Sequence, residues 1–117
     1  MLADLLMNIA ILVLDGGLGS AITLVLDVLR TSAAQREQPS STHLSVRSVA
    51  GESVRLASGL RLQAEAALDD SPVDIAVVPG LEVSSAEHLD ALLQRADVRA
   101  AMPWLRAIHA AGGHVYA

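Results

Sequence analysis

Two apolar runs, each stopped by a glycine turn, constrain the fold of this chain most. The first occupies residues 8–14 and ends at residues 15–17, Asp-Gly-Gly, and the second occupies residues 74–78 and ends at Pro79-Gly80. Three of the four residues from 75 to 78 are β-branched, which is typical of a strand buried on both faces. Helical patterns follow both runs. We therefore predict an α/β fold with a mostly parallel sheet, which would bind ligands at the strand ends that carry these turns.

The pattern after the first run predicts a helix, a loop and a second strand. Ser20 is a suitable N-cap for a helix that runs to about Ser32. Residues 33–42 are polar and contain a proline, which predicts a surface loop, and the alternation over residues 44–49 predicts a strand. The apolar residues that we expect on the buried face of the helix are Ile22, Leu24, Val25, Leu26, Val28 and Leu29.

Two short elements are predicted before the second run. Residues 54–56 and 60–62 flank an Ala-Ser-Gly turn, and this arrangement predicts a small hairpin or a strand with a tight turn. Residues 64–68 favour a short helical turn.

A capping box opens the helical region that follows the second run. Ser84 as N-cap and Glu87 three residues later can satisfy each other's backbone N–H groups. Pro103 lies too deep for a continuous helix, so we expect a break there. The glycines at 112 and 113 end the last helix, and residues 114–117 open another strand. The residues expected to be buried in the first of these helices are Leu89, Leu92 and Leu93.

Composition excludes several classes of site and partner. The 117 residues include no Cys, so no disulfide, thiolate metal site or thiol nucleophile exists in this chain. The four histidines lack the spacing that places two imidazoles on one metal, and we predict neither a metal nor a cofactor. The net charge of −5 disfavours binding to phosphate backbones. No signal peptide or membrane span is predicted, and a cytoplasmic location is expected.

The strand pattern at residues 114–117 has no following loop or helix, which would leave an unpaired sheet edge. We therefore expect these 117 residues to be a fragment of a longer protein. The alternative is a natural short protein whose final strand lies at the edge of its sheet.

The order of elements resembles the PfpI-type branch of the class I glutamine amidotransferase-like superfamily. The two runs, the first glycine loop and the closing segment 104–117 carry this resemblance, which covers about residues 7–117. Within that branch the chain is most similar to the amino-terminal sensing domain of AraC-family transcription regulators. The resemblance implies an α/β three-layer sandwich with a mostly parallel, flavodoxin-like sheet, incomplete at its C-terminal side.

The resemblance also implies a function. Residues 1–117 would be part of a PfpI-like sensing domain, ending before the family's nucleophile elbow and without the DNA-binding domain. Ala21 lies near the position where the family's enzymes carry an acidic residue, which favours a non-catalytic sensor of a small-molecule effector. The implied protein is a homodimer that contacts DNA only through a region outside this chain. The alternatives are a truncated PfpI-type hydrolase, hydratase or glyoxalase-like enzyme lacking its nucleophile, and a small standalone interaction domain.

The two glycine turns are the candidate binding site. The first lies between a strand and a helix N-terminus, where a ligand could be held, although a tight β–α turn also needs glycine. A dinucleotide fingerprint fails because Ile22 occupies the place of its last glycine. In the resembling family the second turn supplies backbone N–H groups with the geometry of an oxyanion hole, and here it could hold an effector's carboxylate or carbonyl; alternatively it only ends a strand. The candidate residues are Asp15, Gly16, Gly17, Pro79, Gly80, Leu81 and Glu82.

Overall fold

The computed structural model describes residues 7–34 and 42–117, which build a five-stranded sheet. The strands lie in the order β5-β2-β1-β6-β7, and every neighbouring pair is parallel. Their bounds are β1 Met7–Leu12, β2 Thr42–Ser48, β5 Ala66–Ala67, β6 Ile75–Val77 and β7 His114–Tyr116. The parallel sheet predicted from the two apolar runs is therefore confirmed.

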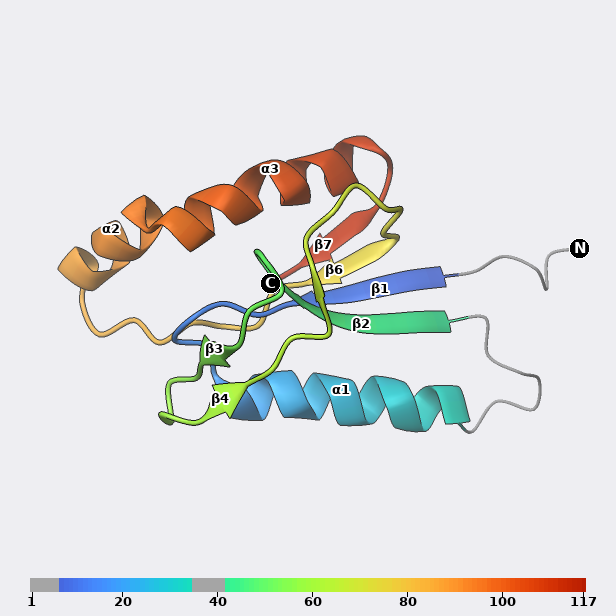
Figure 1. The fold of residues 1–117 in the computed structure, drawn as a ribbon, viewed down its shortest axis with the longest axis horizontal. Helices are drawn as coiled ribbons and strands as arrows, with labels where there is room; N and C mark the ends of the chain where they lie inside the picture. The colour runs from blue at the N-terminus through green and yellow to red at the C-terminus, as the bar shows by residue number, and fades with distance from the viewer. Residues whose placement is uncertain (1–6, 35–41) are drawn as a thin grey trace, which may run out of the picture.

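Helices cover both faces of this sheet (Figure 1). α1 (Gly19–Ala34) lies on one face, and α2 (Ala86–Gln94) with α3 (Ala96–Ala110) lies on the other. The first apolar run serves both layers because successive side chains of a strand point to opposite faces. Ala10, Leu12 and Leu14 pack with Trp104 of α3, whereas Ile11 and Val13 pack with Ile22 of α1. The structure is thus the predicted three-layer α/β sandwich.

β1 is the central strand, and its start is fixed to the start of β6 by side chain and backbone together. The Asn8 N–H donates to Asp74 Oδ2 at 2.7 Å, and the Asp74 N–H donates to the Asn8 carbonyl at 2.8 Å. Within residues 7–34 and 42–117, no helix is long and apolar enough to cross a bilayer.

The predicted hairpin is also present. β3 (Val54–Arg55) and β4 (Arg61–Leu62) pair antiparallel, with Val54 opposite Leu62 and Arg55 opposite Arg61. Val54 is buried in the core on the α1 side, and Leu62 packs against the same cluster. The hairpin therefore stands beside the start of α1 and adds to that layer (Figure 1).

The helical turn predicted at residues 64–68 is wrong, because this segment forms the edge strand β5. The N–H of Glu65 donates to the Val46 carbonyl at 2.8 Å, and the Val46 N–H donates to Glu65 Oε1 at 2.9 Å. β2 offers a row of open backbone groups on this side, and pairing with them outweighs a weak local helical preference.

α1 differs from its prediction at its start, its end and its buried face. It begins at Gly19, so Ser20 is not the N-cap, and the Leu18 carbonyl accepts the Ile22 N–H at 3.2 Å. Leu24 and Val28 are 63% and 57% exposed, which makes the buried face narrower than predicted. The helix runs on to Ala34, and Thr42, the last residue of the predicted loop, already belongs to β2. Residues 35–41 lie outside the described residues.

The cap of α2 is shifted by one residue from the predicted capping box. The Ser85 hydroxyl, not that of Ser84, accepts the His88 N–H at 3.0 Å. His88 takes the role expected for Glu87, since its Nδ1 lies 3.1 Å from the Ser84 N–H that donates to it. Only Leu92 of the three predicted leucines is buried: Leu89 and Leu93 are 45% and 55% exposed.

α3 is continuous through Pro103, so the predicted break is wrong. Proline removes one helical N–H, but the rest of the helix is held by the burial of Ala101, Trp104 and Ile108 against the sheet. The predicted glycine stop is confirmed. Gly112 has φ +93°, and the N–H of Gly113 donates to the Ile108 carbonyl at 2.9 Å, which closes the helix and turns the chain into β7.

Candidate ligand-binding site

The two predicted glycine turns meet at the carboxyl ends of β1 and β6. Gly17 and Leu81 form an isolated antiparallel bridge. On one side of it the Leu18 N–H donates to the Gly80 carbonyl at 2.9 Å, and on the other the Glu82 N–H donates to the Gly16 carbonyl at 2.9 Å. Adjacent parallel strands end at one edge of a sheet, which explains why turns so far apart in the sequence come together.

The β3–β4 hairpin joins the first turn from another side. The N–H of Gly16 donates to the Arg55 carbonyl at 2.8 Å, and the N–H of Ala57 donates to the Gly17 carbonyl at 2.9 Å. In return, the Arg55 N–H donates to Asp15 Oδ1 at 2.9 Å. These three bonds fix the hairpin relative to the two turns.

Arg95, at the junction of α2 and α3, connects the same turn to the opposite layer. Its Nη2 donates to the Asp15 carbonyl at 2.8 Å, while Nε and Nη2 donate to the two carboxylate oxygens of Asp97 at 2.7 and 2.8 Å. Burial alone would raise the pKa of Asp97, but the hydrogen bonds and charge of Arg95 outweigh it, and the pKa is lowered. The hydrogen bond to Asp97 in turn raises the pKa of Arg95. Arg95 therefore stays charged and holds Asp15 in place.

Backbone geometry explains the two glycines of the first turn. Gly16 has φ +84°, a conformation that other residues adopt at a cost. A Cβ on Gly17 would lie 3.2 Å from the Leu14 carbonyl oxygen and 3.3 Å from Ile22 Cδ1. The turn therefore needs glycine for its own shape, as the alternative interpretation of the sequence held.

A hollow of about 460 Å³ lies between this turn, Glu82 and the hairpin. Three of the seven predicted residues, Asp15, Gly16 and Glu82, line it directly. Gly17, Gly80 and Leu81 instead form the bonds that hold its walls together, and Pro79 is buried at the start of the second turn. The remaining lining residues are Ser53, Arg55, Leu56, Ala57 and Arg61.

The chemistry of the lining suits binding. The hollow is lined by two carboxylates, two guanidiniums and one hydroxyl, that of Ser53, which accepts from Arg61 Nη1 at 3.3 Å. One of the backbone donors expected in the second turn, the Glu82 N–H, is bonded to Gly16. The walls of the hollow therefore offer charged and polar contacts to a ligand.

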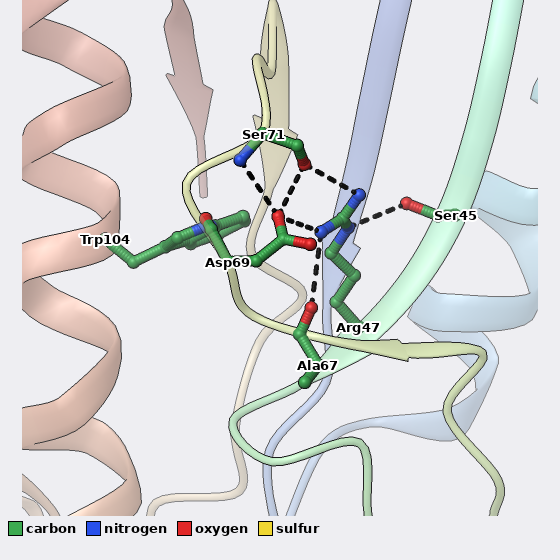
Figure 2. A network of polar contacts seen from close by, with 6 residues as sticks. All are labelled: Ser45, Arg47, Ala67, Asp69, Ser71 and Trp104. Atoms are coloured by element: carbon green, nitrogen blue, oxygen red, sulfur yellow. Dashed lines mark hydrogen bonds and ion pairs between the residues drawn. The ribbon is translucent and has the colours of Figure 1, made fainter.

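A second polar cluster, whose residues do not line the hollow, has a structural role (Figure 2). Arg47 of β2 donates to Asp69 Oδ1 at 2.8 Å, to the Ala67 carbonyl at 3.2 Å and to Ser45 Oγ at 3.0 Å. Hydrogen bonds from Ser71, with a smaller contribution from Arg47, lower the pKa of Asp69. Trp104 Nε1 donates to the Asp69 carbonyl at 3.1 Å. Asp69 is exposed, and its contacts with Arg47 and Trp104 connect β2 to α3.

Sequence reasoning missed three arginines of the candidate site: Arg55, Arg61 and Arg95. A signal for the first two was present, because they occupy mirror positions in the two halves of the predicted hairpin. Pairing the strands about the Ala-Ser-Gly turn would have placed them opposite each other. Arg95 had no such signal, since its contact with Asp15 spans 80 residues.

No protein-family profile matches this sequence, and no curated protein has a sequence that matches it. Solved structures do match its fold. A protein assigned as a transcriptional regulator from Vibrio parahaemolyticus has a TM-score of 0.74 and 19% identity, over 95% of this chain and 55% of that one. An AraC family transcriptional regulator from Pseudomonas putida has a TM-score of 0.64 and 23% identity, over 93% of this chain and 62% of that one. DJ-1beta from Drosophila melanogaster has a TM-score of 0.66 and 18% identity, over 95% of this chain and 54% of that one.

The chain has the DJ-1/PfpI fold. The expected likeness to PfpI-type proteins and to regulators of the AraC family is thus confirmed at the level of the fold. The chain spans only 54% to 62% of the length of the three structures named above. Within this fold, the hollow lies where an α/β sheet offers its ligand site, at the carboxyl ends of the strands.

Proposed function

We propose that this chain is a non-catalytic, effector-sensing part of an AraC-like transcription regulator, with a small molecule bound in the hollow at Asp15, Gly16 and Glu82. In this proposal the whole protein is a cytoplasmic homodimer, and it contacts DNA through a region outside these 117 residues. The observation that carries the proposal is the hollow itself: hydrogen bonds join the two turns and the hairpin, and charged side chains line the space between them.

Two further observations support a regulator. Transcriptional regulators from Vibrio and Pseudomonas are among the solved structures with this fold. Ala21, near the position where the family's enzymes carry an acidic residue, has no group that can exchange a proton. The alternative, a truncated PfpI-type hydrolase, hydratase or glyoxalase-like enzyme, would take its nucleophile from a region outside these 117 residues, and Ala21 is the residue that disfavours it.

A ligand screen tests this proposal on the chain as it is. Small metabolites are added in excess, thermal unfolding identifies those that raise Tm, and amide chemical shifts of 15N-labelled protein locate them. A ligand that binds only the folded state must raise Tm. We expect shifts at Gly16, Gly17 and Leu81, and no turnover of ester or 2-oxoaldehyde substrates.

A matched pair of variants makes the test specific to the hollow. Ala57→Trp places an indole in the hollow, whereas Ala100→Trp places one on the exposed side of α3. The first should abolish the ligand-induced rise in Tm and the second should preserve it. A screen in which no compound shifts these amides, or in which a substrate is turned over, would contradict the proposal.

A further inference from the structure

The hairpin presents two positive charges to the hollow in one direction. Arg55 and Arg61 stand directly opposite each other across β3 and β4, and both line the hollow. Directly opposite residues of an antiparallel pair point to the same face. The neighbouring pair, Val54 and Leu62, faces the core instead and anchors the hairpin there.

Neither guanidinium forms an ion pair with the described residues. Arg55 makes no side-chain hydrogen bond or ion pair with them, and Arg61 makes one, the 3.3 Å bond to Ser53 Oγ. Like charges directly opposite each other destabilise a strand pair. Two arginines in this arrangement weaken a hairpin that has only two residues in each strand.

The position of this pair is nevertheless fixed. The carbonyl and N–H of Arg55 are both bonded to the first turn, and the N–H of Ala57 bonds to Gly17. The Arg55 guanidinium therefore extends from a backbone that is bonded to the first turn, and Arg61 is held beside it by the pairing of β3 with β4. An anion placed between them would remove their mutual repulsion and would meet donors in the fork geometry that suits carboxylates and phosphates.

We propose that Arg55 and Arg61 together bind one oxyanion group, a carboxylate or a phosphate, of the ligand that occupies the hollow. This inference rests on the proposed function, because it names the chemical class of that ligand. Asp15 and Glu82 line the same hollow and repel further negative charge. The site therefore takes one oxyanion group and selects against ligands with several.

Titration of the 15N-labelled chain with simple anions tests the pair. The probes are inorganic phosphate and sodium acetate, each at constant ionic strength against chloride, with methyl acetate as the uncharged counterpart. We expect saturable shifts of the Gly16, Arg55 and Ala57 amides with at least one of the two anions and none with methyl acetate. The stronger binder shows whether the group is a phosphate or a carboxylate.

Variants connect the binding to the two side chains. Arg55→Gln and Arg61→Gln should each weaken anion binding by about tenfold, the effect of losing one charge-assisted hydrogen-bonding partner. Arg106→Gln, which removes an exposed arginine of α3, is the control with the same change in charge and should bind as the parent does. Without anion, the two hairpin variants should unfold at the same temperature as the parent or higher, because the repulsion is relieved. Weakened binding then cannot be attributed to unfolding.

Arg61→Glu is a sharper version of the test. It replaces a repulsive cross-strand pair by an attractive one, so the hairpin should be retained while anion binding is lost. Anion binding that is unchanged in all three hairpin variants, or equally weakened in Arg106→Gln, would overturn the proposal.

The failure of this inference is distinguishable from failure of the proposed function. Uncharged compounds from the screen that shift Gly17 and Leu81 and bind equally well to Arg55→Gln would leave a ligand-sensing hollow but overturn the oxyanion site. An absence of any compound that shifts these amides would overturn the proposed function itself.

Discussion

Asp15 links the first turn to two other parts of the molecule. Its Oδ1 accepts the Arg55 N–H, and its carbonyl accepts from Arg95. Asp15→Ala removes the side-chain acceptor and should lower the free energy of unfolding by about 1 kcal/mol, a typical value for one such bond. Asp15→Asn keeps an acceptor oxygen and should cost less than half as much. Urea unfolding measures both, and equal losses in the two variants would contradict the role of Oδ1.

The pair Arg95–Asp97 predicts a dependence of stability on pH. The pKa of Asp97 is lower in the folded chain than the ordinary value of 3.8 for an aspartate, because Arg95 hydrogen-bonds to the carboxylate and attracts its charge. As the pH falls, the unfolded chain therefore takes up this proton first, so the contribution of the pair is fully present above about pH 4 and is lost below it. Asp97→Asn should destabilise the chain by about 1 kcal/mol at pH 7, and the difference from the parent should shrink as the pH is lowered below 4. Urea unfolding at several pH values measures this difference, and a constant difference would contradict the assignment.

At this scale the sequence predicted the residues of the turns but not their partners. Gly16 and Gly17 could be identified because a turn after a buried strand needs glycine. The partners are supplied by tertiary structure: the bonds of Asp15 to Arg55 and Arg95 span 40 and 80 residues. Similarly, the shift of the α2 cap from Ser84 to Ser85 depends on an imidazole replacing a carboxylate, which the capping-box pattern does not describe.

Pro103 lies inside α3 and should destabilise this helix. Its position inside the helix leaves the Arg99 carbonyl without a helical N–H donor. Since Pro103 is exposed, Pro103→Ala restores that bond without disturbing the core, and it should raise the free energy of unfolding by between about 1 and 3 kcal/mol. Thermal and urea unfolding measure the change. A loss of stability would mean that the proline has a packing role.

Of the two glycines at the junction between α3 and β7, only Gly112 has space for a side chain. A Cβ on Gly113 would lie 2.7 Å from Ile108 Cγ2 and 2.9 Å from the Val73 carbonyl oxygen, whereas Gly112 has open space but a φ of +93°. Gly113→Ala should therefore destabilise the chain by about 2 to 3 kcal/mol, and Gly112→Ala by about 1 kcal/mol. Urea unfolding ranks the two. The reverse order would show that the junction is loosely packed.

Element types were predictable wherever burial determined them. The runs that became β1 and β6 are apolar because both faces of the sheet are covered, and that requirement is visible in the sequence. Residues 64–68 and Pro103 were predicted wrongly for one reason. In each case local preference was overruled, in β5 by the open edge of β2 and in α3 by contacts with the sheet.

For the whole molecule, charge predicts behaviour toward nucleic acid. The net charge of the chain is −5. The two arginines that line the hollow lie beside two carboxylates, those of Asp15 and Glu82. Duplex DNA should bind these 117 residues more weakly than about 10⁻⁴ M at physiological salt, the weak end of non-specific binding. Fluorescence anisotropy with labelled duplexes measures this, with the same titration at low salt as a control. Tight, sequence-dependent binding would contradict the assignment of DNA contact to a region outside this chain.

The sequence predicted where the site lies in the molecule, but it did not predict all the parts of the chain that form it. Two buried strands, each followed by a glycine turn, imply a shared edge in a parallel sheet, and the structure brings both turns to that edge. The position of the β3–β4 hairpin, which forms the third side of the hollow, could not be predicted, because a hairpin can pack against either face of the sheet. Its side was decided by the packing of Val54 and Leu62 with the α1 layer.

The central place of β1 has a consequence during synthesis. This strand leaves the ribosome before the other strands of the sheet, but the bonds between Asn8 and Asp74 join residues 66 positions apart. At ordinary translation rates about 3 to 13 seconds pass before Asp74 follows Asn8, and during that time this apolar strand has one side unpaired. Such a strand is a target for chaperones that recognise extended apolar segments. A site built from turns that follow β1 and β6 is therefore completed only after both strands have been synthesised.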